Sequence, residues 1–170
     1  RMGKVDVRRE TINEKSVAYV AIDRAAKLNA LDTNLIRDIS AQFDALSEDQ
    51  VLQAVVLEGA GKSWIVGADI NEMSRLDSRT AKTFIRNLHT TMLKIRNFPV
   101  PVIAKINGYA LGAGMEVAAA FDIRISSCSS SFGMPEVQVG LPSVIEASLL
   151  PRLMGAGRAS RLMLTGEGID

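Results

Sequence analysis

The sequence has 170 residues, with 20 lysines and arginines against 19 aspartates and glutamates, so its formal net charge is +1. This balance argues against nucleic acid as the main partner, because neutralising several phosphates needs a clustered basic surface. Hydrophobic residues make up 47% of the sequence and charged residues 23%, as in soluble globular proteins. We therefore expect one compact domain over residues 1–170.

The cysteine and histidine counts exclude further classes. A single cysteine, Cys128, cannot form an internal disulfide, and a single histidine, His89, cannot supply a His-rich metal site. No apolar run approaches the roughly 20 residues that span a bilayer, and the first ten residues lack the apolar centre of a signal peptide. We expect no metal site, no membrane association and a cytoplasmic location.

The first predicted element is a hairpin. Apolar residues of one parity lie on both sides of the polar segment Asn13–Lys15, namely Val5, Val7, Val17, Tyr19 and Ala21. This alternation predicts two strands. A period of three and four residues then follows Asp32 and predicts an amphipathic helix of about 14 residues, with its apolar face formed by Leu35, Ile36, Ile39, Phe43 and Leu46.

Strands and helices alternate through the rest of the chain. Short apolar runs predict buried strands, and apolar periodicity predicts helices. The predicted strands are Ala54–Leu57, Pro101–Ile106 and Ile123–Ser126, and the predicted helices are 79–97, Val117–Ala120, 143–153 and 158–165. A glycine-bounded loop separates the first of these strands from helix 79–97. This order favours an α/β fold with largely buried strands.

Two loops of small residues are candidates for binding a phosphate group or a carbonyl oxygen that becomes an oxyanion. In the segment Ile106–Glu116, Gly112 and Gly114 let another group approach the backbone, and the helix beyond them begins with amides that lack internal partners. Close packing of the helix on a strand explains these glycines equally well. Gly67 and Ala68 form a similar loop. Together the two loops could each donate one N–H to an oxyanion.

Glu116 and Glu136 stand out among the acidic residues because apolar residues surround both in the sequence. Such surroundings raise the pKa of a carboxylic acid, as acid/base catalysis near neutral pH requires. Taken singly, each glutamate is more often a charge at a helix start or half of an ion pair. His89 lacks a neighbouring motif, and we expect it to be a surface or partly packed residue.

Four segments, in this order, resemble the enoyl-CoA hydratase/isomerase family, also called the crotonase family. They are Asp23–Leu31, Gly67–Ile70, Asn107–Glu116 and Met134–Pro142. The resemblance implies an α/β fold of the crotonase-like ββα superhelix type, and we expect the C-terminal helical part of that fold to be missing from this sequence. It also implies an acyl-CoA thioester as the substrate, so that coenzyme A is part of the substrate and no other cofactor is needed.

The resemblance assigns roles by matched position. It implies that the amides of Ala68 and Ala113 form the oxyanion hole and that Glu116 and Glu136 are the catalytic pair, with Glu116 acting on the water and Glu136 on the Cα proton. The expected substrate-binding residues are Ala26, Lys27, Leu28, Ala30, Val66, Asp69, Ile70, Gly112, Pro135, Gly140 and Leu141. With the C-terminal segment present, family members are homotrimers or dimers of trimers.

The sequence departs from the family at Ser143–Ala147, where a glycine-rich turn is common. Here Glu146 adds a third acidic group at the predicted border of the acyl pocket. Family members that only shift a double bond often lack the first glutamate, so the presence of both favours an enoyl-CoA hydratase. An acyl-CoA thioester hydrolase or enoyl-CoA isomerase of the same family, and a non-catalytic scaffold or RNA-binding member, are the alternatives.

Overall fold

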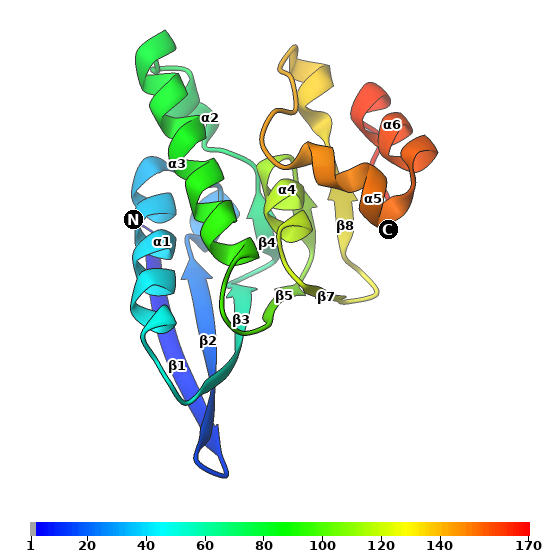
Figure 1. Cartoon of the computed structure of the whole chain (residues 1–170). Coiled ribbons are helices and arrows are strands. Elements are labelled where there is room, and N and C mark those ends of the chain that lie inside the picture. Colours follow the sequence, from blue (N-terminus) through cyan, green and yellow to red (C-terminus); the bar gives the residue numbers. More distant parts are fainter. Residues whose placement is uncertain (1–2) are drawn as a thin grey trace.

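The computed structural model describes residues 3–170, which form two sheets with helices packed on them (Figure 1). The large sheet has the order β1-β2-β3-β5-β7 and the small sheet the order β4-β6-β8. The strands of the large sheet are β1 (Lys4–Ile12), β2 (Lys15–Asp23), β3 (Leu52–Gly59), β5 (Val102–Ile106) and β7 (Ile123–Ser126). The strands of the small sheet are β4 (Ser63–Val66), β6 (Tyr109–Leu111) and β8 (Ser131–Gly133).

Helices and short 3₁₀ turns connect these strands. The α-helices are α1 (Thr33–Ser47), α2 (Ile70–Met73), α3 (Ser78–Arg96), α4 (Ala113–Ala119), α5 (Leu150–Met154) and α6 (Ala156–Thr165). The 3₁₀ turns are η1 (Ala25–Lys27), η2 (Pro135–Val139) and η3 (Ala147–Leu149). Strands β1 and β2 are antiparallel, whereas all other neighbouring strands in both sheets are parallel. The expected α/β class is confirmed.

The predicted hairpin is confirmed, but the parity assigned to its second strand is wrong. Val5 pairs with Ile22 and Val7 with Val20, so the even-numbered residues of β2 share a face with them. The buried residues of β2 are Ser16, Ala18, Val20 and Ile22. Because both faces of β2 carry apolar or small side chains, alternation alone cannot identify the face that the helices cover.

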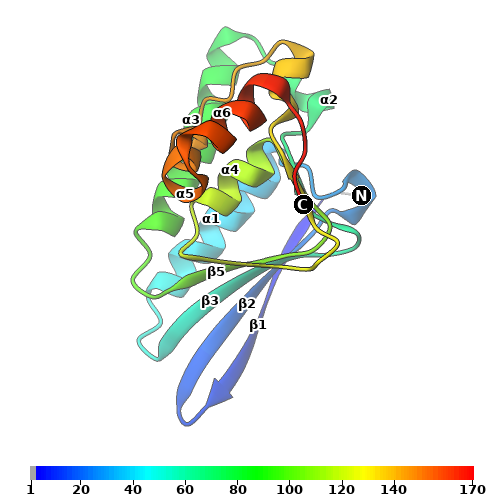
Figure 2. The ribbon, with the colours of Figure 1, turned by 90° about the vertical axis from the view of Figure 1, so that its right-hand side faces the viewer.

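Two long amphipathic helices cover one face of the large sheet, as Figure 2 shows for α1 and α3. The side chain of Asp32 accepts a hydrogen bond from the Leu35 amide and so caps α1. Asp77 and Thr80 form a capping box at the start of α3. The buried residues of α1 are the five that the periodicity predicts, namely Leu35, Ile36, Ile39, Phe43 and Leu46.

The small sheet was not predicted, because its strands have only three or four residues and lie in segments rich in small residues. Helix α4 begins at Ala113, earlier than the predicted Val117. The predicted helix 143–153 is also wrong at its start, since regular helical turns begin at Ala147. Strand β7 is an edge strand and its residues are exposed, contrary to the expected burial.

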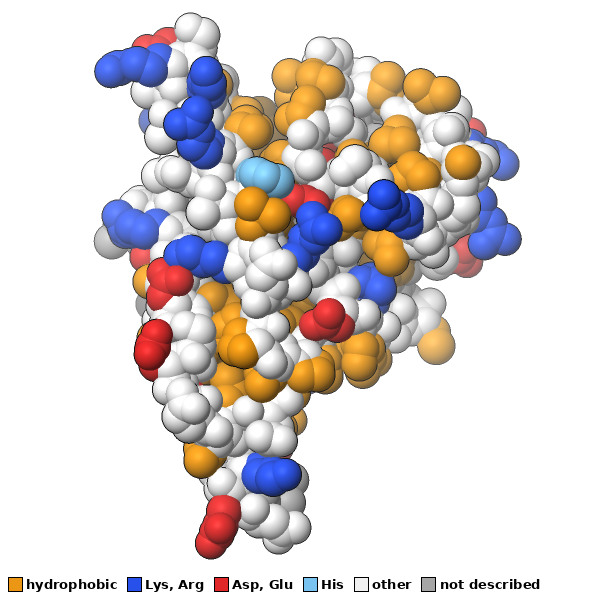
Figure 3. All heavy atoms as spheres, viewed as in Figure 1, with side chains coloured by type: hydrophobic (Ala, Val, Ile, Leu, Met, Phe, Trp, Pro, Cys, Tyr) orange, Lys and Arg blue, Asp and Glu red, His pale blue; other side chains and the backbone are white. Residues whose placement is uncertain are grey.

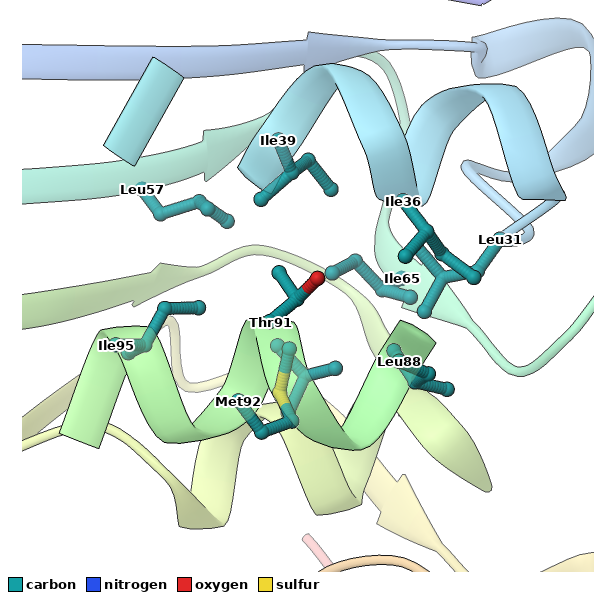
Figure 4. A pocket seen from close by; sticks show the side chains of 10 residues that line it. Leu31, Ile36, Ile39, Leu57, Ile65, Leu88, Thr91, Met92 and Ile95 are labelled. Atoms are coloured by element: carbon teal, nitrogen blue, oxygen red, sulfur yellow. The ribbon is translucent and has the colours of Figure 1, made fainter. Parts of the chain in front are cut away.

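The core between α1, α3 and β3 contains one small apolar cavity (Figure 4). Its volume of about 10 Å³ is near the minimum that a single water needs. The side chains around it include Ile39, Leu57 and Ile95, while the Thr91 hydroxyl donates to the carbonyl of Asn87 within α3. This cavity is a packing gap in the core and is too small for an acyl chain.

No helix within residues 3–170 combines the length and the apolar character that crossing a lipid bilayer requires.

Candidate active site

The small parallel sheet places three candidate groups at one edge. Val66 at the end of β4 pairs with Leu111 at the end of β6, and Leu111 pairs with Gly133 at the end of β8. The carboxyl ends of the three strands therefore lie side by side. The groups that follow them within two or three residues are the Ala68 amide, the Ala113 amide and the Glu136 carboxyl. Crevices beyond the carboxyl ends of parallel strands are common ligand sites.

Strand β4 is fixed against the large sheet by Trp64 and Ile65, both fully buried. The Trp64 indole N–H donates to the Leu57 carbonyl at 3.2 Å, and the Trp64 ring contacts Phe121 edge to face. The chain turns beyond β4 at Gly67, whose φ of +68° lies in the left-handed region. The rigid strand thus determines where the loop with Ala68 begins.

The Ala68 amide lies outside the pairing that holds its loop. The Leu31 amide donates to the Gly67 carbonyl at 2.9 Å, and the Asp69 amide donates to the Leu31 carbonyl at 2.8 Å. Neither bond uses the N–H of Ala68. This N–H is therefore positioned by its neighbours and remains a candidate donor to a ligand.

Arg24 secures the same loop through the Asp69 side chain. Its guanidinium lies 2.7 Å from Asp69 Oδ2 and 2.9 Å from Asp32 Oδ2, and it also donates to the Ala30 carbonyl. Burial alone would raise the pKa of Asp69, but the Arg24 guanidinium and the amides at the start of α2 lower it below its usual value. The carboxylate of Asp69 is thus occupied within the protein. Its backbone is occupied as well, because the amide donates to Leu31 and the carbonyl accepts from Met73.

The Gly112 turn provides the second candidate amide. Gly112 has φ +55° and ψ −123°, a combination that side chains disfavour, and its amide donates to the Gly133 carbonyl at 2.8 Å. Ala113 is the first residue of α4, so its N–H has no partner within the helix. A Cβ atom on Gly112 would lie 3.7 Å from the Gly67 Cα, which shows that the two loops meet.

Glu116 lies one turn into α4 and is 3% exposed. Its Oε1 accepts hydrogen bonds from the amides of Ile145 and Ala147, both at 3.0 Å. Burial, with a smaller contribution from the charge of Glu136, raises the pKa of Glu116 to about 7, although the amides of 145–147 oppose the shift. The carboxyl group therefore exchanges its proton near neutral pH, as general acid/base catalysis needs.

Glu136 extends from η2 toward the Gly112 turn. A Cβ atom at Gly112 would stand 2.5 Å from Glu136 Oε1, and the Ser143 hydroxyl donates to Oε2 over a long 3.5 Å. The pKa of Glu136 is raised, chiefly by its burial. Its charge also contributes to the raised pKa of Glu116.

Glu146 is not a free third acidic group at the candidate site, which corrects the expectation from the sequence. Its carboxylate is 2% exposed and bonds to His89 Nδ1 at 3.0 Å and Arg96 Nη1 at 3.2 Å. His89 is partly exposed, as expected, and Glu146 is its partner. No sequence pattern indicates these contacts, because Glu146 lies 57 residues from His89 and 50 residues from Arg96.

The expected substrate-binding residues fall into two groups. Ala26, Lys27, Leu28 and Ala30 lie on and after η1, beside the loop that contains Val66, Asp69 and Ile70. Gly112, Pro135, Gly140 and Leu141 lie around η2, near Glu136. Ile70 and Leu141 are exposed, with 79% and 52% of their surfaces accessible. The role of these residues in substrate binding stays a prediction.

Asn29 is a structural residue that the sequence reasoning missed. It is fully buried, and its side-chain amide donates to the carbonyls of Ala60 and Ser63 at 2.9 and 2.8 Å. Its Oδ1 accepts from the Arg24 amide, and its φ of +57° suits asparagine better than most residues. Asn29 thus joins the η1 loop to the start of β4. The only indication of this role in the sequence is that Asn29 lies between Leu28 and Ala30, shortly after charged residues.

Across residues 3–170, no three histidine, cysteine, aspartate or glutamate side chains come together in a way that could hold a metal ion.

Comparison with known proteins identifies the family. Residues 12–170 match the family model described as enoyl-CoA hydratase/isomerase. A "Short-chain-enoyl-CoA hydratase" of Clostridium acetobutylicum is 37% identical over 158 residues, which cover 92% of this chain and 60% of the relative. A "Crotonyl-CoA hydratase" of Syntrophomonas wolfei is 35% identical over 159 residues, which cover 92% of this chain and 61% of the relative.

Solved structures give the same result for the fold. The crystal structure of an enoyl-CoA hydratase from Bacillus anthracis matches with a TM-score of 0.92 and 32% identity, over 98% of this chain and 64% of that one. An enoyl-CoA hydratase/carnithine racemase structure from Magnetospirillum magneticum has a TM-score of 0.91 and 30% identity, over 100% and 64% of the two chains. This chain spans about 60% of the length of the curated relatives. The fold is of the crotonase type, and the chain belongs to the enoyl-CoA hydratase/isomerase family.

Proposed function

We propose that this chain supplies the active site of an enoyl-CoA hydratase, which adds water across the 2,3 double bond of an enoyl-CoA thioester. One observation carries the proposal: two glutamates with raised pKa values, Glu116 and Glu136, both lie next to the Gly112 turn, which the Ala68 loop approaches. The names of the two hydratase relatives support the same reaction and a short acyl chain. The reaction needs no cofactor beyond the coenzyme A of the substrate.

The two amides act on the thioester carbonyl. Its oxygen accepts hydrogen bonds from Ala68 and Ala113, and these bonds strengthen as negative charge develops during attack on the double bond. Removing one such donor typically costs about 3 to 4 kcal/mol of transition-state stabilisation. Because both donors are backbone groups at the ends of paired strands, they need little reorganisation during the reaction.

The glutamates divide the proton transfers. Glu116 removes a proton from water while the water oxygen bonds to Cβ, and Glu136 donates its proton to Cα. The product gains one hydroxyl group and one proton, and the pair ends with its single proton on Glu116 instead of Glu136. The raised pKa values of both groups, about 7 for Glu116, favour proton exchange with the substrate near neutral pH.

Substrate contacts follow the two groups of predicted residues. The loop from Ala26 to Ala30 and the loop from Val66 to Ile70 embrace the coenzyme A portion, whereas the residues around η2 border the acyl chain. Asn29 and Arg24 hold the first two loops together, which supports a common binding surface. Lys27 is exposed and supplies a positive charge for a phosphate group.

Thioester hydrolysis is the weaker candidate. The departure from the family at 143–147 keeps this alternative open in the sequence. In the structure, Arg96 and His89 bind the Glu146 carboxylate, so this group is not free to attack an acyl group. Nothing else in this segment favours hydrolysis over hydration.

For the complete protein, we propose a homotrimer or dimer of trimers in the cytoplasm. Ile123 and Ile125 support self-association, because these apolar side chains are 47% and 57% exposed on the edge strand β7. A free, exposed Cys128 suits a reducing compartment.

Incubation with crotonyl-CoA tests the reaction. We expect absorbance of the conjugated double bond to decrease without release of a free thiol. Release of thiol at the same rate would indicate hydrolysis, and the absence of both signals would indicate a non-catalytic protein. Both of these results would contradict the proposal.

A further inference from the structure

The segment 145–147 contacts both α3 and α4, the first through a side chain and the second through backbone amides. The Glu146 side chain contacts α3, where Arg96 and His89 surround its carboxylate at 3.2 and 3.0 Å. The amides on either side, those of Ile145 and Ala147, both donate to Glu116 on α4. The histidine side chain, pale blue in Figure 3, lies at the surface with acidic and basic side chains beside it.

The Glu146 carboxylate has a strong reason to stay in this place. It is 2% exposed, and a carboxylate buried without partners is strongly unfavourable. Its charge is compensated by Arg96, which is 39% exposed at its side chain, and by the hydrogen bond from His89. Since 141–146 contains no regular helix or strand, this side chain is the main polar anchor of the segment to α3.

We propose that Glu146, held by Arg96 and His89, is a positioning residue that keeps the amides of 145–147 directed at the Glu116 carboxyl. The proposal rests on the function proposed above. The amides of Ile145 and Ala147 donate to one carboxyl group here, and the side chain of Glu146 between them fixes their orientation. Misplacing a reacting group by about 1 Å can cost about 100-fold in rate.

The charged groups around Glu116 allow a specific prediction about its proton. Glu136 approaches from η2 and raises the pKa of Glu116, whereas the three amides of 145–147 lower it. Glu146 reaches toward α3, where Arg96 and His89 compensate it. When Glu146 loses its contacts with α3, the amides of 145–147 no longer donate to Glu116, whereas the charge of Glu136 still acts on it. The pKa of Glu116 then increases.

The test uses three variants and one matched control. Glu146→Gln keeps the size of the side chain but removes its charge, Arg96→Gln removes the partner, and Arg96→Lys keeps the positive charge. Lys94→Gln is the control, because Lys94 lies on the same helix and bonds to Asp44 and Ser40 on α1. The kcat and KM for crotonyl-CoA are measured between about pH 5.5 and about pH 9, a range that includes the titration of a base near neutrality.

For Glu146→Gln and Arg96→Gln, we expect kcat to decrease by about tenfold or more, KM to change little, and the acidic limb of the kcat profile to move to higher pH. Arg96→Lys restores most of the activity, and Lys94→Gln retains the wild-type profile. If the Gln variants are folded by circular dichroism and keep both the wild-type kcat and the wild-type limb, the proposal is wrong. It is also wrong if Lys94→Gln shifts the limb equally.

A second measurement separates this proposal from the proposed function. The Glu116 carboxyl group is titrated by carbon-13 NMR in the wild type, Arg96→Gln and Arg96→Lys, which needs no turnover. We expect the titration to move to higher pH in Arg96→Gln and to return in Arg96→Lys. An unchanged titration in Arg96→Gln overturns the positioning role even if the wild type hydrates crotonyl-CoA. If the wild type does not hydrate crotonyl-CoA but the titration still shifts in Arg96→Gln, only the proposed hydratase function is contradicted.

Discussion

The carboxylate of Glu136 lies so close to Gly112 that a Cβ atom on Gly112 would stand 2.5 Å from Glu136 Oε1. Gly112 also has a φ of +55°, so two independent constraints favour glycine. We predict that Gly112→Ala displaces the Glu136 carboxylate and the neighbouring Ala113 amide together. The expected loss in kcat is about 100-fold, because both groups act on the same substrate. Turnover of crotonyl-CoA measures it.

Gly155→Ala is the matched control for this substitution. Gly155 has a φ of +84°, and no atom lies within 4 Å of the position that its Cβ would occupy. Both variants therefore carry backbone strain of about 1 to 3 kcal/mol, but only Gly112→Ala pushes against a candidate catalytic group. Equal kcat values for the two variants would show that the contact between Gly112 and Glu136 has no catalytic importance.

Substituting the glutamates tests their roles in proton transfer. We predict that Glu116→Gln and Glu136→Gln each lower kcat by about 10² to 10⁴-fold with small changes in KM, because glutamine keeps the shape of the side chain. Wild-type kcat should rise with pH through about 7 as Glu116 ionises. Glu167→Gln, which removes only an exposed pair with Arg161, serves as the control. Unchanged turnover in both test variants would remove the mechanism.

The buried carboxyl group of Glu116 also makes stability depend on pH. Its pKa is about 7 in the folded protein and near 4.5 when unfolded, so the folded state binds the proton more tightly. Stability should therefore decrease as pH rises from 4.5 through 7 and then level off. We predict that Glu116→Gln removes most of this decrease and is more stable than the wild type above pH 7, by up to about 3 kcal/mol.

Urea unfolding at several pH values measures this effect. The free energy of unfolding of the wild type should decrease between pH 5 and pH 8 relative to that of Glu116→Gln, whereas Glu167→Gln should follow the wild type. Parallel curves for the wild type and Glu116→Gln would mean that the folded protein does not raise the pKa of Glu116.

The sequence was sufficient for the parts of the fold with strong local patterns. The apolar period after Asp32 identified every buried residue of α1, and the short runs at Ala54 and Pro101 marked β3 and β5. The small sheet has strands of three or four residues, too short for periodicity to show. That sheet brings the segments with Ala68, Ala113 and Glu136 to one edge. The sequence therefore indicated the candidate residues but not the sheet that places them there.

Long-range polar contacts were the other missing part. We expected Glu146 to be a third acidic group at the border of the acyl pocket, because the sequence does not show its contact with Arg96, 50 residues earlier. The same holds for Asn29, whose contacts reach Ala60 and Ser63. Glu116 and Glu136 could be selected because their apolar neighbours are adjacent in sequence. Burial raises both pKa values, in agreement with that selection.

Arg24 provides a test of how the Ala68 loop is held. Its guanidinium bonds to Asp69 and Asp32, and the Arg24 and Asp69 side chains are 11% and 8% exposed. We predict that Arg24→Gln lowers the free energy of unfolding by about 3 kcal/mol, because Asp69 keeps a buried charge without its partner. The pKa of Asp69 should increase as well, since Arg24 is the main group that opposes the effect of burial.

The same substitution should lower kcat, because Asp69 follows Ala68 directly and its displacement moves the proposed oxyanion donor. Urea unfolding at pH 7 and turnover of crotonyl-CoA measure the two effects. Arg161→Gln is the control, since Arg161 forms an exposed pair with Glu167 whose loss should cost no more than about 1 kcal/mol. If Arg24→Gln is as stable and active as Arg161→Gln, the loop is held by its backbone pairing with Leu31 alone. A stable variant with reduced kcat would instead show that Arg24 positions Ala68 without contributing to the stability of the fold.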